Sequence, residues 1–168
     1  MQLKNLKFLS ILLILSLNLI ANTSASAGNT VGAEQAVNEE DSLMSSKHYT
    51  AVADSYIRFL NEKNLEGILS LYAENGSVED PVGSEVLSGK ARLREFYSGA
   101  VVIDLSLTRT GPVRVAGQEA AFPFQLLMEV DGATMKTDII DVFRFDKAGK
   151  IVQMRAFWGP DNRRPATE

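Results

Sequence analysis

An aspartate interrupts an apolar strand pattern in the C-terminal half of the chain, in the stretch TMKTDIIDVFRF at 134–145. Because strand side chains alternate between two faces, Asp141 is expected to share a face with Ile139 and Phe143. A carboxylate buried among such residues is costly unless it has a charged partner or keeps its proton at neutral pH. A protonated Asp141 would be a hydrogen-bond donor in an apolar setting.

Three tyrosines could supply further donors to the interior. Tyr56, Tyr72 and Tyr97 each fall on the apolar stripe of an expected helix, and a buried tyrosine normally finds a partner for its hydroxyl. A tyrosine beside a neutral carboxylic acid forms a pair of donors that can stabilise an oxyanion. Asp80, which precedes a proline in a bend, is a second acid in a different setting, so the two carboxyl groups could divide into base and donor.

Both aspartates also have ordinary structural interpretations. Asp141 could be a strand residue that meets a backbone N–H, and Asp80 could be a turn residue. Structural networks bury carboxylates as well as active sites do. The spacing of these residues leaves the catalytic and the structural interpretation open.

Hydrophobic periodicity predicts three helices in the first part of the domain. The first begins at Tyr49 and ends at the polar sequence NEKN, and Asn64 can cap a second helix that ends at Asn75-Gly76. After a short strand or turn with the sequence SVEDPV, Ser88 can cap a third helix that Gly99 ends. Tyr72 and Tyr97 would lie on the second and third helices.

The remainder of the domain has the pattern of strands, with Asp131-Gly132 as a strong hairpin signal. Helices followed by a strand meander predict an α+β domain in which the helices pack on one face of a curved antiparallel sheet. The apolar faces of these strands, which include Phe124, Met154 and Trp158, could line a pocket, although core packing is the more common use. The predicted strands are 101–108, 112–115, 121–130, 133–145 and 151–158.

The ends of the chain differ in composition from the domain. Lys4 and Lys7 precede an apolar run, and Ala25-Ser26-Ala27 fits a cleavage site, which predicts a signal peptide over 1–27 and export to the periplasm or beyond. An uncleaved membrane anchor is the alternative. Residues 28–48 are expected to be a disordered acidic lead-in, 49–160 the domain, and 161–168 a flexible tail.

Charge and composition restrict the partners. Residues 1–27 hold two lysines and no acidic residue, so their removal changes the formal charge from −4 to −6, and such a surface does not favour nucleic acid. The chain has no cysteine, so an exported product would rely on its core rather than on disulfides. His48 is the only histidine, and one histidine without cysteines predicts no zinc site.

Several short motifs occur together in order between residues 50 and 160. Each is weak alone, and the complete set resembles the bacterial Δ5-3-ketosteroid isomerases. The motifs are YIRFL at 56–60, LYAE at 71–74, VEDP at 78–81, FY at 96–97, TGPVR at 110–114, PF at 123–124, DIIDVFRFD at 138–146 and MRAFW at 154–158.

The resemblance implies the cone-shaped fold of nuclear transport factor 2 and the SnoaL-like proteins, usually as a homodimer. It implies that Asp80 is the general base and that Tyr56 and a protonated Asp141 are the oxyanion donors. A carboxylic acid kept neutral by apolar surroundings is a known feature of this family. Tyr72 and Tyr97 would bond to the first tyrosine, and the wall that packs on a flat hydrophobic substrate would contain Phe124, Met154 and Trp158.

The reaction implied by the resemblance moves a double bond of a 3-ketosteroid from the β,γ to the α,β position through a dienolate, without a metal or organic cofactor. Two alternatives stay open. One is another small-molecule reaction on the same fold, such as that of a cyclase, dehydratase or hydrolase. The other is an exported ligand-binding module without catalysis, because fold alone does not set function.

Two features of the chain differ from the family pattern. Val82 follows the Asp-Pro pair where an aromatic residue is expected, and the segments at 98–101 and 115–122 are slightly short. Both differences would change the mouth of the pocket. Asp138 should face the side of its strand opposite to Asp141, and its role stays open.

Overall fold

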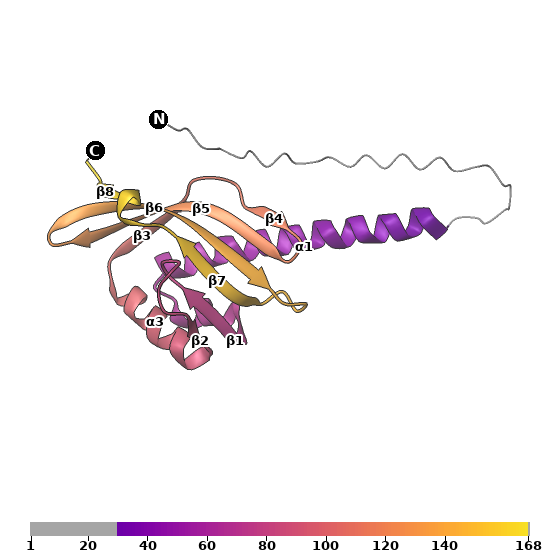
Figure 1. Ribbon diagram of the computed structural model, residues 1–168, viewed down its shortest axis with the longest axis horizontal. Helices are drawn as coiled ribbons and strands as arrows, with labels where there is room; N and C mark the ends of the chain where they lie inside the picture. Colours follow the sequence, from indigo (N-terminus) through magenta and orange to yellow (C-terminus); the bar gives the residue numbers. More distant parts are fainter. Residues whose placement is uncertain (1–29, 168) are drawn as a thin grey trace, which may run out of the picture.

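The computed structural model describes residues 30–167 (Figure 1), and the predicted signal peptide lies outside this part of the chain. The helical layer of the fold consists of three α-helices, α1 (Thr30–Asn61), α2 (Leu65–Ser70) and α3 (Lys90–Val102). No helix in residues 30–167 is long and apolar enough to cross a membrane. The strands are β1 (Tyr72–Glu79), β2 (Leu87–Ser88), β3 (Leu105–Arg109), β4 (Arg114–Ala116), β5 (Glu119–Val130), β6 (Ala133–Phe145), β7 (Ile151–Phe157) and β8 (Arg163–Pro165).

Helix α1 contains the predicted first helix but begins much earlier. Its residues Val52, Ala53, Tyr56 and Leu60 are buried, as the apolar stripe predicts. The helix starts at Thr30, so the prediction of a disordered lead-in is wrong for residues 30–48. The sequence AEQAVNEEDSLMSSK contains neither glycine nor proline and many good helix formers, so helix propensity explains the extension.

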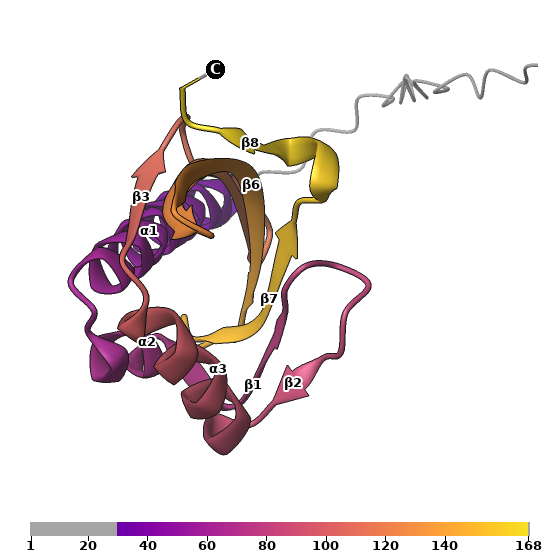
Figure 2. The same ribbon diagram turned by 90° about the vertical axis from the view of Figure 1, so that its left-hand side faces the viewer.

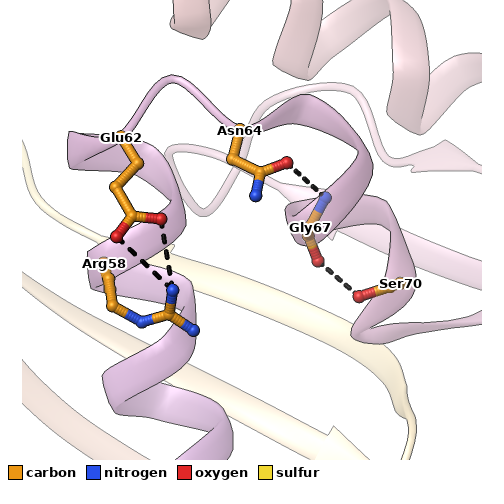
Figure 3. A network of polar contacts seen from close by, with 5 residues as sticks. All are labelled: Arg58, Glu62, Asn64, Gly67 and Ser70. Atoms are coloured by element: carbon orange, nitrogen blue, oxygen red, sulfur yellow. Dashed lines mark hydrogen bonds and ion pairs between the residues drawn. The ribbon is translucent and has the colours of Figure 1, made fainter.

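One prediction is confirmed at the start of α2, which Figure 3 shows, and another is corrected at its end. Asn64 caps α2, because its Oδ1 accepts a hydrogen bond from the Gly67 N–H at 2.8 Å. The helix ends at Ser70, and Tyr72 is the first residue of β1 rather than part of a helix. Tyr72 pairs with Ile151 of β7, so pairing across the sheet overrides the local helical pattern.

Helix α3 is displaced from its predicted ends. Gly89, with φ +83°, is the N-cap, while Ser88 belongs to β2 and makes no cap. The helix continues past Gly99 to Val102, so the strand expected from residue 101 begins only at Leu105. A glycine within a helix is tolerated at a modest cost, and here Leu93 and Tyr97 bury the inner face.

The strands form one curved mixed sheet with the order β2-β1-β7-β6-β5-β3, in which β4 also pairs with β5 and β8 with β6. The predicted antiparallel pairing holds for every pair of neighbouring strands in this sheet except one. Strand β1 runs parallel to β7. Figure 2 shows α1 against the concave side of the sheet and α3 beside β1. The chain has the predicted cone-shaped α+β fold.

The long hairpin of β5 and β6 sets the register of the interior. Asp131 and Gly132 have φ +53° and +79°, which is the left-handed geometry that the Asp-Gly signal predicts. Phe122 lies opposite Asp141 and Phe124 opposite Ile139. The alternation predicted from sequence is confirmed along β5 and β6, and the buried residues of β5, β6 and β7 are Ala120, Phe122, Phe124, Thr137, Ile139, Asp141, Phe143, Phe145, Ile151, Met154 and Ala156.

The C-terminal residues are ordered rather than the predicted flexible tail. A short 3-10 helix (Pro160–Asn162) leads into β8, and β8 pairs with residues 135–137 of β6 (Figure 2). Strand β7 pairs with β6 only from Ile140 onward, which leaves the first part of the β6 edge open. A sheet edge with unpaired backbone groups favours the addition of another strand, and β8 covers it.

Truncation of Phe143 tests the packing between α1 and the sheet. The side chain is fully buried and meets the rings of Tyr56 and Phe122 edge to face, with centroid distances of 5.1 and 5.0 Å. We expect Phe143→Ala to lower the free energy of unfolding by about 3–5 kcal/mol in urea denaturation. Val102→Ala, at a side chain 79% exposed, should stay within about 0.5 kcal/mol, and a loss that small for Phe143→Ala would contradict the packing.

Candidate active site

Asp141 is buried in the middle of the sheet, as its position in the sequence predicts. Its side chain is 1% exposed and lies between Phe122 on β5 and Ala156 on β7. The oxygen Oδ1 has no hydrogen-bond partner among the described residues. Burial raises the pKa of Asp141 well above its usual range, and the nearby charge of Asp80 adds to the effect. Burial therefore favours the neutral form of Asp141, which would have a donor to offer.

The three predicted tyrosines form a chain of hydroxyl groups. The hydroxyl oxygens of Tyr72 and Tyr97 are 2.5 Å apart, and the Tyr97 hydroxyl donates to that of Tyr56 over 3.4 Å. Because each hydroxyl has one proton, Tyr72 must donate to Tyr97 in this arrangement. The proton of Tyr56 stays available for an acceptor in the adjacent cavity, and the chain strengthens it as a donor.

Burial keeps this tyrosine chain in its neutral form. It raises the pKa of Tyr56 well above the usual value, and the negative charge of Asp141, when ionised, has the same effect. The pKa values of Tyr72 and Tyr97 are raised for the same leading reason. The hydroxyl groups of all three side chains are thus protonated donors at neutral pH.

Asp80 is the second acid, and its surroundings differ from those of Asp141. It follows β1 directly, and its Oδ1 accepts a hydrogen bond from the Trp158 indole Nε1 at 2.6 Å. Burial raises the pKa of Asp80, while the bond from Trp158 acts in the opposite direction. A hydrogen-bonded carboxylate with a moderately raised pKa fits a general base.

One cavity of about 110 Å³ brings these groups together. Tyr56, Tyr97, Asp80 and Asp141 all line it, and they come from α1, α3, the end of β1 and β6. The rest of the lining is apolar and includes Leu60, Phe96, Leu107, Phe124, Leu126 and Ile139. A few convergent polar groups in an apolar hollow are typical of a site for a small hydrophobic molecule.

The structure separates the predicted wall residues into three roles. Phe124 lines the cavity. Met154 is fully buried opposite Phe143 and Val78 and belongs to the core rather than to the lining. Trp158 donates a hydrogen bond to Asp80. Strand alternation could not predict this bond, because the two residues come together only through the parallel pairing of β1 with β7.

Two further expectations concern residues outside the cavity. Asp138 faces the outer side of the sheet, as predicted, where it accepts a hydrogen bond from Gln125 and pairs with Arg164 at 2.7 Å. These two contacts lower the pKa of Asp138. Val82 is half-buried, and its N–H donates to the carbonyl of Ala156 on β7. Among the side chains that the structure describes, those of residues 46–167, no three His, Cys, Asp or Glu are grouped to hold a metal ion.

Comparison with known proteins agrees with this geometry. Residues 53–154 match the family described as SnoaL-like domain. The chain belongs to the SnoaL-like family. It is 38% identical over 93 residues to a steroid delta-isomerase of Nocardioides simplex, and the match covers 55% of this chain and 75% of that protein. The predicted fold and family resemblance are therefore confirmed.

Other SnoaL-like relatives carry out different reactions. The chain is 28% identical over 113 residues to the epoxide hydrolase LasB of Streptomyces lasalocidi, covering 64% of this chain and 40% of that protein. A solved structure of the epoxide hydrolase/cyclase-like enzyme SalBIII superposes with a TM-score of 0.65 and 28% identity, covering 70% of this chain and 95% of that one. The relatives are enzymes that act on small molecules, with more than one type of reaction among them.

The protonation state of Asp141 can be tested through stability. Between the pKa of an unfolded aspartate, about 3.9, and its raised folded value, the folded protein holds a proton that the unfolded chain has released. The stability of the wild type should therefore fall with rising pH in this window, by about 1.4 kcal/mol per pH unit from this residue.

Asp141→Asn removes that titration, so we expect the variant to gain stability relative to the wild type as pH rises above about 4, measured by urea denaturation at several pH values. Asp161→Asn, on the exposed 3-10 helix, is the control and should follow the wild-type pH profile. Parallel pH profiles for wild type and Asp141→Asn would show that Asp141 is ionised.

Proposed function

We propose that the protein is an isomerase of the steroid delta-isomerase type, which moves a carbon–carbon double bond into conjugation with a ketone. The observation that carries this proposal is the unpartnered, buried Oδ1 of Asp141, in the same apolar cavity as Asp80 and Tyr56. A neutral acid and a tyrosine then offer two donors to one ketone oxygen, with a carboxylate available as base. The similarity to the Nocardioides simplex steroid delta-isomerase supports the same reaction.

The proposed reaction has two proton transfers and one intermediate. Asp80 removes a proton from the carbon between the ketone and the β,γ double bond, and the electron pair moves into the carbonyl to give a dienolate. Tyr56 and Asp141 donate hydrogen bonds to the oxygen, where the negative charge develops. Asp80 then returns the same proton to the far carbon of the original double bond, which leaves the α,β-unsaturated ketone.

The environments of the two aspartates support this division of roles. Trp158 donates to Asp80 and so favours its ionised form, whereas no described residue donates to Oδ1 of Asp141. Because Asp141 is the more deeply buried acid, it keeps its proton while Asp80 ionises. A substrate oxygen at Asp141 would give this buried acid the hydrogen-bond partner that it lacks.

An epoxide-opening reaction is the second candidate, because LasB is similar to this chain in sequence, SalBIII is similar in structure, and both are named for such chemistry. A neutral acid could protonate an epoxide oxygen, and a carboxylate could activate water or a hydroxyl group. The tyrosine chain behind Tyr56 favours the isomerase, since a charged enolate oxygen benefits more from two donors. Incubation with a hydrophobic epoxide, followed by chromatography of the products, distinguishes the two reactions.

Two other features are proposals that do not depend on the reaction. The N-terminal sequence supports export from the cytosol, and the family resemblance supports a homodimer. An exported ligand-binding module without catalysis is the remaining alternative. It would bind a ketosteroid without converting it, so the assay for turnover separates it from an isomerase.

Substitution of the two aspartates tests the catalytic roles. With 5-androstene-3,17-dione as substrate, appearance of the conjugated enone is followed by ultraviolet absorbance. We expect Asp80→Asn to lower kcat by about 10²–10⁴, the usual contribution of a general base. Asp141→Ala should lower it by about 10²–10³, as for the loss of one oxyanion donor.

Asp138→Asn is the matched control, because Asp138 lies on the same strand but on the outer face. Its activity should stay within about threefold of the wild type, since it touches neither the cavity nor the proposed donors. Wild-type turnover in both Asp80→Asn and Asp141→Ala would refute the assignment.

Replacement of Trp158 tests its influence on the base. Trp158→Phe removes the donor to the Asp80 carboxylate, and loss of a hydrogen bond to the charged form raises a carboxyl pKa. The acidic limb of the pH profile of kcat/KM should therefore move to higher pH. The control is Phe157→Leu, a neighbouring change at a side chain 42% exposed on the other face of β7. An unmoved limb in Trp158→Phe would mean that the indole does not tune the base.

A further inference from the structure

The interior face of the sheet carries a second polar group besides Asp141. Thr137 is fully buried, and Thr137 and Asp141 are the buried polar residues on the interior face of β6. They lie four positions apart, so their Cα atoms are about 13 Å apart at the usual rise of an extended strand. This separation is comparable to the length of a four-ring steroid skeleton.

Register across the sheet connects Thr137 to the cavity and to the C-terminal strand. Leu126, which lines the cavity, lies directly opposite Thr137 on β5. On the other side Thr137 lies opposite Arg163 of β8. Paired residues on neighbouring strands point to the same face, so Arg163 belongs to the interior face, while its neighbour Arg164 points outward.

The contacts of Arg163 agree with this placement. Its Nε donates to the Thr137 hydroxyl over 3.3 Å, and its guanidinium lies 4.9 Å from the centre of the Trp158 ring. Trp158 in turn donates to Asp80. Arg163 therefore lies next to the indole and beside Thr137, four positions along β6 from Asp141, on the terminal strand that Figure 2 shows along β6.

The charge of Arg163 has no anionic partner among residues 46–167, the part of the chain whose side chains the structure describes. It takes part in none of the ion pairs there, and its terminal nitrogens make no side-chain hydrogen bond with the described residues. Arg164 differs, because it pairs with Asp138 on the outer face. A half-buried guanidinium with two free nitrogens is well suited to a carboxylate, which it can bind with two parallel hydrogen bonds.

We propose that Arg163, held by Thr137 and Trp158, forms an anion subsite, and that the substrate is a flat polycyclic ketone with a carboxylate at the end opposite to the ketone. This inference rests on the proposed function for the position of the ketone at Tyr56 and Asp141. The apolar lining between the two ends, with Phe124, Leu126 and Ile139, would contact the rings. The ketone end fixes the reaction, and the carboxylate end selects the molecule.

The test compares two steroids that differ at the distal end. The substrates are 5-androstene-3,17-dione and 3-oxo-5-androstene-17β-carboxylate, and their conjugated products serve as ligands for equilibrium binding. Trp158 is the only tryptophan and touches both Asp80 and Arg163, so its fluorescence reports binding independently of turnover. The wild type should favour the carboxylate by about 10- to 100-fold in kcat/KM and in affinity, the range for one charge-assisted hydrogen bond.

Arg163→Met removes the charge and keeps an apolar side chain against the indole. In this variant the ratio of kcat/KM for the carboxylate to kcat/KM for the dione should fall to near one. General damage to the site lowers both values and cancels in the ratio. Arg164→Met is the control on the outer face and should keep the wild-type ratio. Raised salt should weaken the preference of the wild type, since the subsite is partly exposed.

The outcomes separate this inference from the proposed function. Isomerisation of both steroids with equal kcat/KM would overturn the anion subsite and leave the isomerase intact. An Arg163-dependent preference in binding, without isomerisation, would overturn the isomerase and support the subsite. Failure to bind or convert either steroid would overturn both the isomerase and the anion subsite. If Arg163→Met kept the preference for the carboxylate, another residue would cause that preference and the subsite would be refuted.

Discussion

The cost of placing a carboxyl group in an apolar interior governs this site. Asp141 lies among the aromatic residues of a curved sheet, and its Oδ1 has no donor among the described residues. An ionised group there would lack both solvent and partner, so burial raises the pKa of Asp141 and favours its protonated form. Burial thus converts an ordinary acid into a donor, and this conversion needs the complete sheet around it.

The two aspartates in one cavity differ in burial and in hydrogen bonding, and both factors shift their pKa values. Asp80 accepts a hydrogen bond from Trp158, which stabilises its anion, while Asp141 has no comparable donor. The pairing of β1 with β7 brings Asp80 and Trp158 together, and the hairpin of β5 and β6 holds Asp141 across from them. The charge on one acid also raises the cost of ionising the other.

Local patterns in the sequence predicted the features that depend on local geometry. Strand alternation placed Asp141 inside, and the Asp131-Gly132 signal set the hairpin, because each follows from backbone geometry over a few residues. The spacing of Tyr72 predicts a helix, and only its pairing with Ile151 shows it to be in a strand. The bond from Trp158 to Asp80 and the addition of β8 likewise depend on contacts between distant segments.

Residues that lie side by side on neighbouring strands form rows across the sheet. The row that contains Asp141 differs from the row at the far end of the pocket in how easily its residues can be replaced. The row through Asp141 has a strand on each side of β6, with the buried residues Phe122 and Ala156 as its neighbours, so a change there would disturb the core. The row through Thr137 ends at Arg163, on a three-residue strand that pairs with β6 alone. A residue on such a terminal strand can change with little effect on the core, so the far end of the pocket is where substrate selection can diverge within one fold.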